Sequence, residues 1–386
     1  MFRFLTAGES HGRALTAIVE GVPAGLALYE EYIARDLKRR QGGYGRGGRM
    51  KIEQDRAEIL SGVRYGFTIG SPISLLIWNR DWENWQEVMA ISPTEKESEP
   101  VTRLRPGHAD LAGAIKYGQD DVRPILERAS ARETAARVAV GAVARKLLEE
   151  LGIEIHSHTI AIGGVRSKSE TFDWDQVEGS PVRCADPDAG KAMMAVIDDA
   201  KEAGDSVGGV FQVVAIGVPI GLGSHVQWDR RLDGRIAQAM MSINAVKGIE
   251  IGAGFSLADT KGSEAHDVIQ FDNVKKRWHH ASNRAGGIEG GITNGEPVVV
   301  NVVVKPIPTL GKPLPSADLK TGKTVQAHVE RADACVVPAA GVIGEAMLAI
   351  VLADAALEKF GGDHIKETLR NCQSYLEATT EKSGDV

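Results

Sequence analysis

Two long runs of apolar residues dominate the pattern of hydrophobic and polar positions along the chain. The first covers residues 134–151, places apolar side chains on nearly every face of a helix, and stops at Gly152. The second covers residues 344–360 and ends at Gly361-Gly362. A helix that is apolar all round is buried on several sides, and a glycine after the last turn is typical of a helix C-terminus. The pattern therefore predicts two core helices that pack as partners.

A capping sequence, Ser-Ala-Arg-Glu at residues 130–133, precedes the first of these helices. The Ser130 hydroxyl can accept a hydrogen bond from the backbone N–H of Glu133, and the Glu133 carboxylate can accept one from the backbone N–H of Ser130. Similar tetrapeptides, RASA at 128–131 and RADA at 331–334, stand ahead of the two helices. This similarity suggests an internal duplication about a pseudo-twofold axis.

Strands are expected where β-branched residues alternate or run together. The candidate strands are residues 153–162, 207–218 and 297–304, and further helices are expected over residues 189–203 and 232–245. Because these elements follow no regular βαβ period, they favour an α+β fold over a doubly wound parallel sheet. The expected architecture is a layered β-α-β sandwich with the two apolar helices at its centre. No Pro/Ser-rich linker divides the chain, so residues 1–386 are expected to form a single domain.

Composition is typical of a globular protein of a reducing compartment. Of the 386 residues, 43% are apolar and 25% are charged, and no apolar run is long and uncharged enough to span a membrane. The three cysteines form neither a CxxC pair nor an even framework, which argues against disulfides and against a metal site. The N-terminal residues lack the pattern of a signal peptide. The expected location is the cytoplasm.

The first candidate for chemistry is Thr-Ala-Gly-Glu-Ser-His-Gly at residues 6–12. It follows an apolar lead and places a hydroxyl, a carboxylate and an imidazole between flexible glycines. Such a strand end is typical of sites where a rigid element delivers reactive side chains to a cleft. The alternative for so short a motif is a polar turn with one surface histidine, His11.

Residues 35–51 carry seven basic residues and one aspartate, in a protein whose net charge is -7. Five glycines in this segment allow close approach of a ligand to the backbone, and the guanidinium groups of Arg39, Arg40, Arg46 and Arg49 suit phosphate or carboxylate. We interpret the segment as a mobile loop that closes over a small polyanion.

Three other interpretations of this basic segment stand beside that one. Residues 43–48 satisfy the GxGxxG pattern of dinucleotide-binding folds, but they follow a helix-like stretch rather than a strand. An Arg-Gly box for RNA is disfavoured by the acidic chain and its 5% aromatic content. A plain solvated loop is the third.

A second histidine stands in Arg-Pro-Gly-His-Ala-Asp at residues 105–110, where Pro-Gly predicts a turn and Arg105 adds a cation beside the imidazole. Histidine exchanges protons near neutral pH, so His11 and His108 in separate turns suit general acid catalysis. A surface or core position is the commoner role of a histidine. No role is assigned to the other eight, His156, His158, His225, His266, His279, His280, His328 and His364.

Three further segments present backbone and polar groups that suit a phosphorylated heterocycle. Residues 282–291 are too polar for a strand and too rich in glycine for a helix, so they are expected to line a space with backbone. Residues 305–309 end a strand with Lys305 and Thr309, and residues 242–245 end a helix with Asn244. Backbone N–H groups, an amide, a cation and a hydroxyl together can hold such a ligand.

Seven motifs, in order along the chain, closely resemble those of the chorismate synthase family. They are AGESHG at 7–12, RRQGGYGRGGRM at 39–50, RPGHAD at 105–110, RASARETAARVA at 128–139, SINAVKG at 242–248, SNRAGGIEGG at 282–291 and KPIPT at 305–309. The resemblance covers nearly the whole chain and is far more specific than any single motif.

The resemblance implies a lyase that converts 5-enolpyruvylshikimate-3-phosphate to chorismate and phosphate by a 1,4-elimination. The reaction has no net redox change but requires reduced FMN. By resemblance, His11 protonates the departing phosphate, His108 protonates the reduced flavin, and Asp333 acts as a base near flavin N5. The residues implied to bind the anionic substrate are Ser10, Arg40, Arg46, Arg49, Arg105 and Arg132.

The same motifs imply the residues that contact the flavin. These are Arg128, Ala129, Ser130, Asn244, Ala245, Gly290, Lys305, Pro306, Ile307, Pro308, Thr309 and Arg331. The family's NADPH association maps to Arg40 and Arg46, and the family implies a homotetramer whose flavin is reduced by NADPH or by a separate flavin reductase. Arg284 and Glu289 depart from the family's pattern, which leaves open the side chain that reaches the flavin ring there.

Two other functions are carried as alternatives. A flavin-dependent reductase would use the same pocket for net hydride transfer and would consume reducing equivalents in proportion to product. A nucleic-acid-binding protein would use the Arg-Gly segment and would show steep salt dependence without turnover. The lyase, which needs neither a nucleic acid nor a membrane, would release phosphate with no reductant consumed per turnover.

Overall fold

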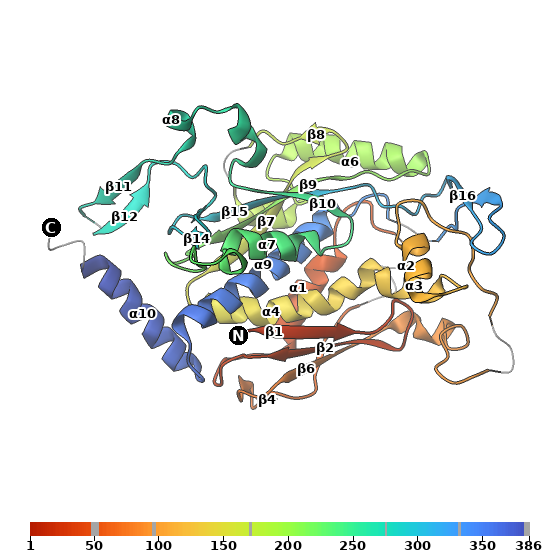
Figure 1. Cartoon of the computed structure of the whole chain (residues 1–386), viewed down its shortest axis with the longest axis horizontal. Coiled ribbons are helices and arrows are strands. Elements are labelled where there is room, and N and C mark those ends of the chain that lie inside the picture. The colour runs from red at the N-terminus through yellow and green to blue at the C-terminus, as the bar shows by residue number, and fades with distance from the viewer. Residues whose placement is uncertain (48–53, 95–97, 170–171, 275, 331–332, 382–386) are drawn as a thin grey trace.

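Figure 1 shows the computed structural model of the chain, in which a layer of helices lies between two β-sheets. The structure describes residues 1–47, 54–94, 98–169, 172–274, 276–330 and 333–381. The mixed α+β class expected from the sequence is confirmed, and the layers follow each other as β-α-β (Figure 1).

The four-stranded sheet has the strand order β1-β2-β6-β3, and each neighbouring pair is antiparallel. Leu15, Ala17 and Val19 of β2 are buried, whereas the residues between them are more exposed. This alternation buries one face of the sheet against the helices. The strands are β1 (Arg3–Ala7), β2 (Ala14–Glu20), β3 (Glu58–Ile59) and β6 (Ile73–Trp78).

The second sheet has five antiparallel strands in the order β10-β15-β9-β7-β8. It contains the three strands expected from the β-branched runs, with ends shifted by a residue or two. The predicted helix at 189–203 is confirmed as α6 (Pro187–Glu202), which packs on β7 and β8. The strands are β7 (Glu154–Ile162), β8 (Val165–Arg166), β9 (Gly209–Ile216), β10 (Val246–Ile251) and β15 (Val298–Val304).

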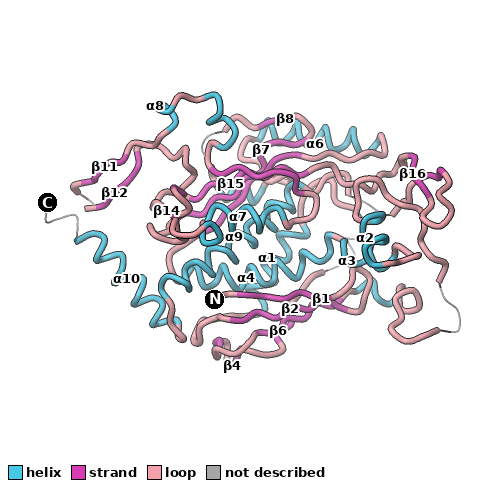
Figure 2. The backbone as a smooth tube through the Cα atoms, viewed as in Figure 1, coloured by secondary structure: helices cyan, strands magenta, loops and turns pink. Residues whose placement is uncertain are grey.

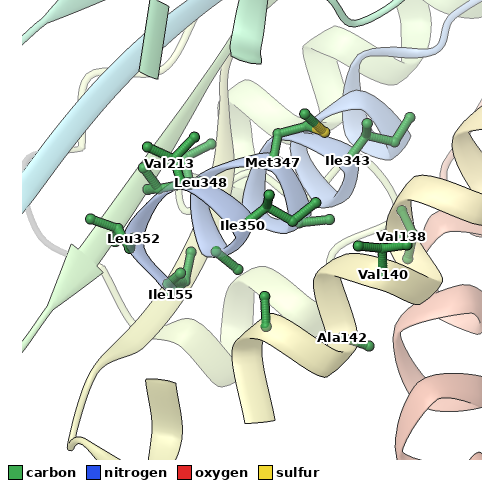
Figure 3. Packing of buried hydrophobic residues seen from close by; sticks show 14 of the residues in the cluster. Val138, Val140, Ala142, Ile155, Val213, Ile343, Met347, Leu348, Ile350 and Leu352 are labelled. Carbon is green, nitrogen blue, oxygen red and sulfur yellow. The ribbon is translucent and has the colours of Figure 1, made fainter. Parts of the chain in front are cut away.

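The central layer consists of α1 (Glu30–Gln41), α4 (Thr134–Glu150) and α9 (Val337–Phe360). α4 packs on β2 and β6, α9 packs on β7 and β9, and the two helices contact each other closely. Figure 3 shows the buried side chains of α9 between α4 and the strand that carries Val213. A Cβ atom on Gly141 of α4 would overlap Ala346 of α9, so glycine allows the close approach. The predicted pair of core helices is confirmed.

α9 begins at Val337 rather than at residue 344. Pro338 lies in its first turn, where the missing N–H removes no helical hydrogen bond. Gly344 weakens the helix signal in the sequence, but in the structure it packs against Phe211, where a side chain would not fit. In the described part of the chain, α9 alone is long and apolar enough to cross a membrane. Its most apolar 18-residue stretch is 94% buried inside the fold, as in a core helix.

The start of α4 differs from the predicted capping box. Ser130 caps a short 3-10 turn, η3 (Ala131–Glu133), where its Oγ accepts from the backbone N–H of Arg132 at 3.3 Å. The Glu133 carboxylate accepts instead from Thr6 Oγ1 at 3.0 Å and from Arg137 Nε at 2.9 Å. The predicted reciprocal bond is therefore wrong, because Glu133 ties the start of α4 to β1.

Shorter elements surround the layers and extend both ends of the sandwich (Figure 2). α7 (Leu232–Met241), the predicted helix at 232–245, packs on α9 and β10. α2 (Asp110–Tyr117) and α3 (Arg123–Ala129) stand at the end far from α10 (Ile365–Glu381) (Figure 1). The others are η2 (Arg80–Asn84), η4 (Trp228–Arg230), η5 (Gly254–Asp259), α5 (Trp174–Gly179), α8 (Gly262–Ala265), β4 (Val63–Arg64), β5 (Phe67–Thr68), β11 (Ile269–Asp272), β12 (Arg277–His280), β13 (Ile288–Glu289), β14 (Ile292–Thr293), β16 (Pro315–Ala317) and β17 (Thr324–Gln326).

The internal duplication stays a prediction. The two main sheets differ in strand number and order. The second tetrapeptide, at 331–334, begins with two residues outside the described part of the chain.

Candidate active site

A cavity of about 1090 Å³ lies near α3, at the end of the sandwich where α2 and α3 stand. Its walls include the turn after β1, the end of α1 and the first turns of both α4 and α9. Because a helix N-terminus carries a partial positive charge, two core helices that begin here favour an anion. The described lining residues with charge are the cations Arg40, Arg46, Arg105, Arg123, Arg132 and Lys305 and the carboxylates Asp81, Glu127, Glu330 and Asp333.

His11 lies in the turn between β1 and β2 and lines the cavity. Its Nδ1 is 2.9 Å from Oε1 of Glu127, a buried residue of α3, and the Trp85 ring stacks on the imidazole with 3.9 Å between centroids. Asn79, which follows β6, donates from Nδ2 to two carbonyl oxygens of the same turn, at 3.1 and 2.7 Å. The turn is therefore held from two elements, with its imidazole at the cavity wall.

His108 lies in the turn that Pro106-Gly107 forms, and it lines the same cavity. Its Nδ1 is 2.5 Å from Oδ1 of Asp110, the first residue of α2. Asp110 also accepts from the backbone N–H of Arg105 at 2.9 Å and from its Nε at 3.1 Å. Burial opposes ionisation of Asp110, but the hydrogen bonds and charges of His108 and Arg105 outweigh it and lower the pKa of Asp110 to about 2.

An Asp110→Asn variant is expected to lose a pH-dependent part of the protein's stability. The folded-state pKa of Asp110 is depressed from 3.8 to about 2, so the ionised carboxylate stabilises the fold fully above a pH of about 4. That contribution disappears as the pH falls through about 2. In urea unfolding at neutral pH, the free energy of unfolding of the variant should be lower by roughly 2 kcal/mol than that of the unchanged protein. A difference that does not shrink in acid would contradict this expectation.

Arg40 and Arg132 share one buried carboxylate, that of Asp55. Oδ1 of Asp55 accepts from Arg132 Nη1 at 2.5 Å, and Oδ2 lies 3.5 Å from Arg40 Nη1. Burial lowers the pKa of Arg40 to about 9; Asp55 opposes the shift and Arg132 adds to it. Arg40 Nε donates to Thr134 Oγ1, and Arg132 Nε donates to Asn79 Oδ1, each at 2.9 Å. The core itself therefore fixes both guanidinium groups at the cavity.

Asp333 and Arg46 form a second charged pair at the cavity wall. Asp333 lies just before α9 and accepts from Arg46 Nη1 at 2.7 Å. It also accepts from the backbone N–H of Gly47 at 2.5 Å. The pair joins the end of the described basic segment to the start of a core helix, and a ligand phosphate or carboxylate can compete for the same arginine N–H donors.

Glu330 joins three cationic or titratable groups on another part of the lining. It accepts from Arg123 Nη1 at 3.0 Å and from Arg105 Nη1 at 3.3 Å, and His328 Nε2 lies 3.4 Å away. Burial opposes ionisation of Glu330, but its hydrogen bond with His328 and the charges of both arginines outweigh it and lower the pKa of Glu330 to about 2. Glu330 thereby holds Arg105 and Arg123 side by side.

The rest of the lining is largely apolar or presents backbone. Asn244 donates from Nδ2 to the carbonyl oxygen of Ala129 at 3.0 Å, and Lys305 donates to that of Gly107 at 2.5 Å. Ala245 has φ 66°, a left-handed conformation that a non-glycine residue keeps only where the surroundings impose it. The predicted flavin contacts on the lining are Ala129, Ser130, Asn244, Ala245, Lys305, Ile307, Pro308 and Thr309, and apolar neighbours on it are Ile243, Val336, Ala339, Ala340 and Ile343.

Most of the residues predicted for the substrate line the cavity, namely Ser10, Arg40, Arg46, Arg105 and Arg132. Arg128, Pro306 and Gly290 do not belong to the described lining. Arg128 donates to the carbonyl oxygens of Thr6 and Gly8, and Gly290 lies between β13 and β14. Arg49 and Arg331 lie outside the described residues, as do residues 48–51 of the basic segment.

The interpretation of residues 35–51 as one mobile loop is wrong for the first part, whereas the helix-like stretch noted before residues 43–48 is confirmed as α1. α1 runs to Gln41, so Arg39 and Arg40 are helical and point to different sides. Arg40 reaches the cavity, whereas Arg39 donates to Glu345 at 2.7 Å and also pairs with Glu178. Arg39 is therefore a core residue and not part of a ligand-binding loop.

Several residues of the site were missed by sequence reasoning, namely Asp55, Asn79, Trp85, Arg123, Glu127, His328 and Glu330. The spacing of Arg123 and Glu127 by one helical turn was a usable signal, since such pairs share a helix face. Asn79 directly follows an alternating strand, which is also a common place for a functional side chain. The others are brought to the cavity by contacts between segments far apart in the chain.

Comparisons with known proteins agree with the geometry. The family model of chorismate synthase matches residues 2–357. The chorismate synthase of Moorella thermoacetica is 59% identical over 98% of this chain and 100% of its own length, and that of Desulforudis audaxviator is 60% identical over 98% of each. A solved crystal structure of a chorismate synthase superposes with a TM-score of 0.80, at 48% identity and 98% coverage of both chains. The chain therefore belongs to the chorismate synthase family.

Proposed function

We propose that this cavity binds 5-enolpyruvylshikimate-3-phosphate and reduced FMN together. As a member of the chorismate synthase family, the protein converts that substrate to chorismate and phosphate. The observation that carries the proposal is the joint placement of three imidazoles, among them His11 and His108, and six cationic side chains on one cavity of about 1090 Å³. This volume lies just above the range of about 300–1,000 Å³ that is typical of a pocket for one small ligand, so the lining residues, and not the volume, carry the proposal of two ligands.

The cations of the cavity fit the charges of both ligands. The substrate carries a phosphate and two carboxylates, and the flavin carries a phosphate. Arg40, Arg46, Arg105 and Arg132 offer planar forks that can bind such groups through paired hydrogen bonds. The carboxylate of Asp55 contacts both Arg40 and Arg132 and holds the two guanidinium groups together at the cavity wall, where an anion can bind.

The remaining lining fits a flavin in its chemical character. Its apolar side chains suit an aromatic ring, and the Ser130 hydroxyl, Asn244 and Lys305 offer polar groups for the phosphate and the ring edge. Arg128, Pro306, Gly290, Arg49 and Arg331 are proposed ligands on the family's motifs alone. When bound, reduced FMN supplies an electron that is lent to the substrate and recovered, so the elimination needs no net redox change.

Three side chains of the chain handle protons in this proposal. His11, with Nδ1 on Glu127, holds a proton at Nε2 for the departing phosphate. His108, with Nδ1 on Asp110, holds one at Nε2 for the flavin. Asp333 presents carboxylate oxygens at the cavity wall and acts as the base. In the described structure Arg46 contacts Asp333, so that pair must loosen when a proton is taken up.

We further propose that the protein is a cytoplasmic homotetramer. Leu5 and Ile18 face each other on neighbouring strands of the four-stranded sheet and are exposed, which supports a subunit contact on its outer face. NADPH is a proposed reductant of the flavin at Arg40 and Arg46. A separate flavin reductase is the other proposed source of electrons.

An anaerobic assay tests the proposed function. Chemically reduced FMN and 5-enolpyruvylshikimate-3-phosphate are added to the purified protein, and phosphate, chorismate and reduced flavin are followed together. The lyase releases phosphate and chorismate in equal amounts while the reduced flavin is not used up. Loss of reduced flavin in proportion to product would favour a reductase, and salt-sensitive RNA binding without turnover would favour the nucleic-acid-binding alternative.

A further inference from the structure

Glu127 makes contacts to His11 that go beyond holding a turn. Its Oε1 lies 2.9 Å from the imidazole Nδ1, and its Oε2 accepts from the backbone N–H of His11 at 2.6 Å. The residue is only 2% exposed, and Arg123 Nη1 lies 3.4 Å from Oε1. One buried carboxylate thus contacts both the main chain and the ring of the same histidine.

This geometry decides which ring nitrogen of His11 carries the fixed proton. An ionised carboxylate has acceptors only, so Nδ1 must be the N–H donor in this contact. Nε2 is then the nitrogen left for the cavity, and within the described residues it has no hydrogen-bond partner. The Trp85 ring stacks on the imidazole face and restricts its rotation.

A purely structural role for Glu127 would duplicate what Asn79 already does. Asn79 is 4% exposed and holds the same turn through two carbonyl oxygens, but it does not contact the imidazole. It also accepts from Arg132 Nε at 2.9 Å. The two residues therefore provide a natural comparison, because both support the turn and only Glu127 contacts the ring.

We propose that Glu127 is a positioning residue that holds His11 with its proton on Nδ1 and presents Nε2 to the departing group of the substrate. The proposal rests on the proposed function of His11 as the proton donor. His108 also contacts a carboxylate through Nδ1, that of Asp110 at 2.5 Å, but Arg105 Nη2 lies 3.4 Å from the Nε2 of this second imidazole.

The test is a double-mutant cycle between Glu127→Gln and His11→Ala, with phosphate release measured under single-turnover and steady-state conditions. Glu127→Gln keeps the side-chain shape but removes the charge and one acceptor. We expect kcat to fall about 10²-fold, of the order of a lost general acid, with KM for the substrate and Kd for reduced FMN changed less than about threefold. In the His11→Ala background, the same substitution should cost less than about threefold, because its effect passes through His11.

Two further variants separate positioning from support of the turn. Glu127→Asp keeps a carboxylate, so its kcat should be at least about tenfold higher than that of Glu127→Gln. It also keeps the test open if the glutamine variant does not fold, which circular dichroism would show. Asn79→Ala removes the acceptor that holds Arg132 Nε, so KM for the substrate should rise. This effect should persist in the His11→Ala background.

The outcomes are distinguishable. If Glu127→Gln lowers activity equally in both backgrounds, or raises KM as much as it lowers kcat, the positioning role is overturned and Glu127 only supports the turn. If His11→Ala alone keeps full turnover, the proposed function of His11 fails, and the positioning role fails with it. If His11→Ala lowers turnover and Glu127→Gln lowers it further by the same factor as in the unchanged protein, the positioning role alone is overturned.

Discussion

An alanine at position 11 or at position 108 is expected to lower turnover by about 10²- to 10⁴-fold, the usual contribution of a positioned general acid. His11 and His108 both line the cavity and are both fixed at Nδ1 by a carboxylate. Neither is the main source of positive charge there, so reduced FMN should still bind to each variant. Phosphate release and flavin binding, measured anaerobically on the same samples, test the expectation.

His156→Ala is the matched control for these two variants. His156 lies on β7, stacks on Trp174 and is not part of the cavity lining. Its loss should leave turnover unchanged. Full activity in both the His11 and the His108 variants would remove the catalytic assignment, whereas loss of flavin binding in step with turnover would assign them to binding instead.

Glu345→Gln is expected to cause the largest loss of stability. Glu345 lies in α9 with its side chain 0% exposed, and it pairs with Arg39 at 2.7 Å, Arg145 at 2.6 Å and Arg183 at 3.1 Å. Burial opposes its ionisation, but these three charges outweigh it and hold the pKa of Glu345 well below its usual range. Removing the shared partner leaves three arginines with only Asp36 and Glu178 as carboxylate partners. The positive charge in excess lies largely buried, so we expect a cost of about 3–5 kcal/mol in the free energy of unfolding.

Glu178→Gln provides the comparison, measured by urea unfolding under the same conditions. Glu178 pairs with two of the same arginines, Arg39 and Arg183, but its side chain is 40% exposed. Water can replace its contribution, so its loss should cost about 1 kcal/mol or less. Equal losses in the two variants would mean that the buried cluster does not stabilise the core as described.

The central layer could be predicted because its signal is local. A run that is apolar on every face predicts a buried helix whatever surrounds it, and α4 was predicted almost to its last residue. The start of α9 was missed because Gly344 interrupts the pattern, and only the packing on Phe211 explains that glycine. The predicted capping box at Ser130 is wrong because of another tertiary contact that the local sequence does not show. The Glu133 carboxylate accepts a hydrogen bond from Thr6 of β1 instead of from the backbone of Ser130.

The candidate site was predicted where a motif carries its own chemistry. His11 and His108 stand in glycine-containing turns, and both reach the cavity. Their carboxylate partners differ in how far they could be foreseen. Asp110 is two residues from His108, but Glu127 is 116 residues from His11, and nothing local joins them.

Consecutive arginines show why composition alone could not assign the basic segment. Arg39 and Arg40 are neighbours on α1, and adjacent residues of a helix point about 100° apart. One reaches the Glu345 cluster, and the other reaches Asp55 at the cavity. A loop would have allowed both to face one ligand, so the length of the helix decided the role of each.

The most direct test of the account is a crystal structure of the protein with FMN and 5-enolpyruvylshikimate-3-phosphate bound together. The account predicts both ring systems in contact within the cavity between α3 and the first turns of α4 and α9. It places the substrate phosphate within hydrogen-bond reach of His11 Nε2. Ring systems bound far apart, or a cavity that excludes His11 and His108, would contradict it.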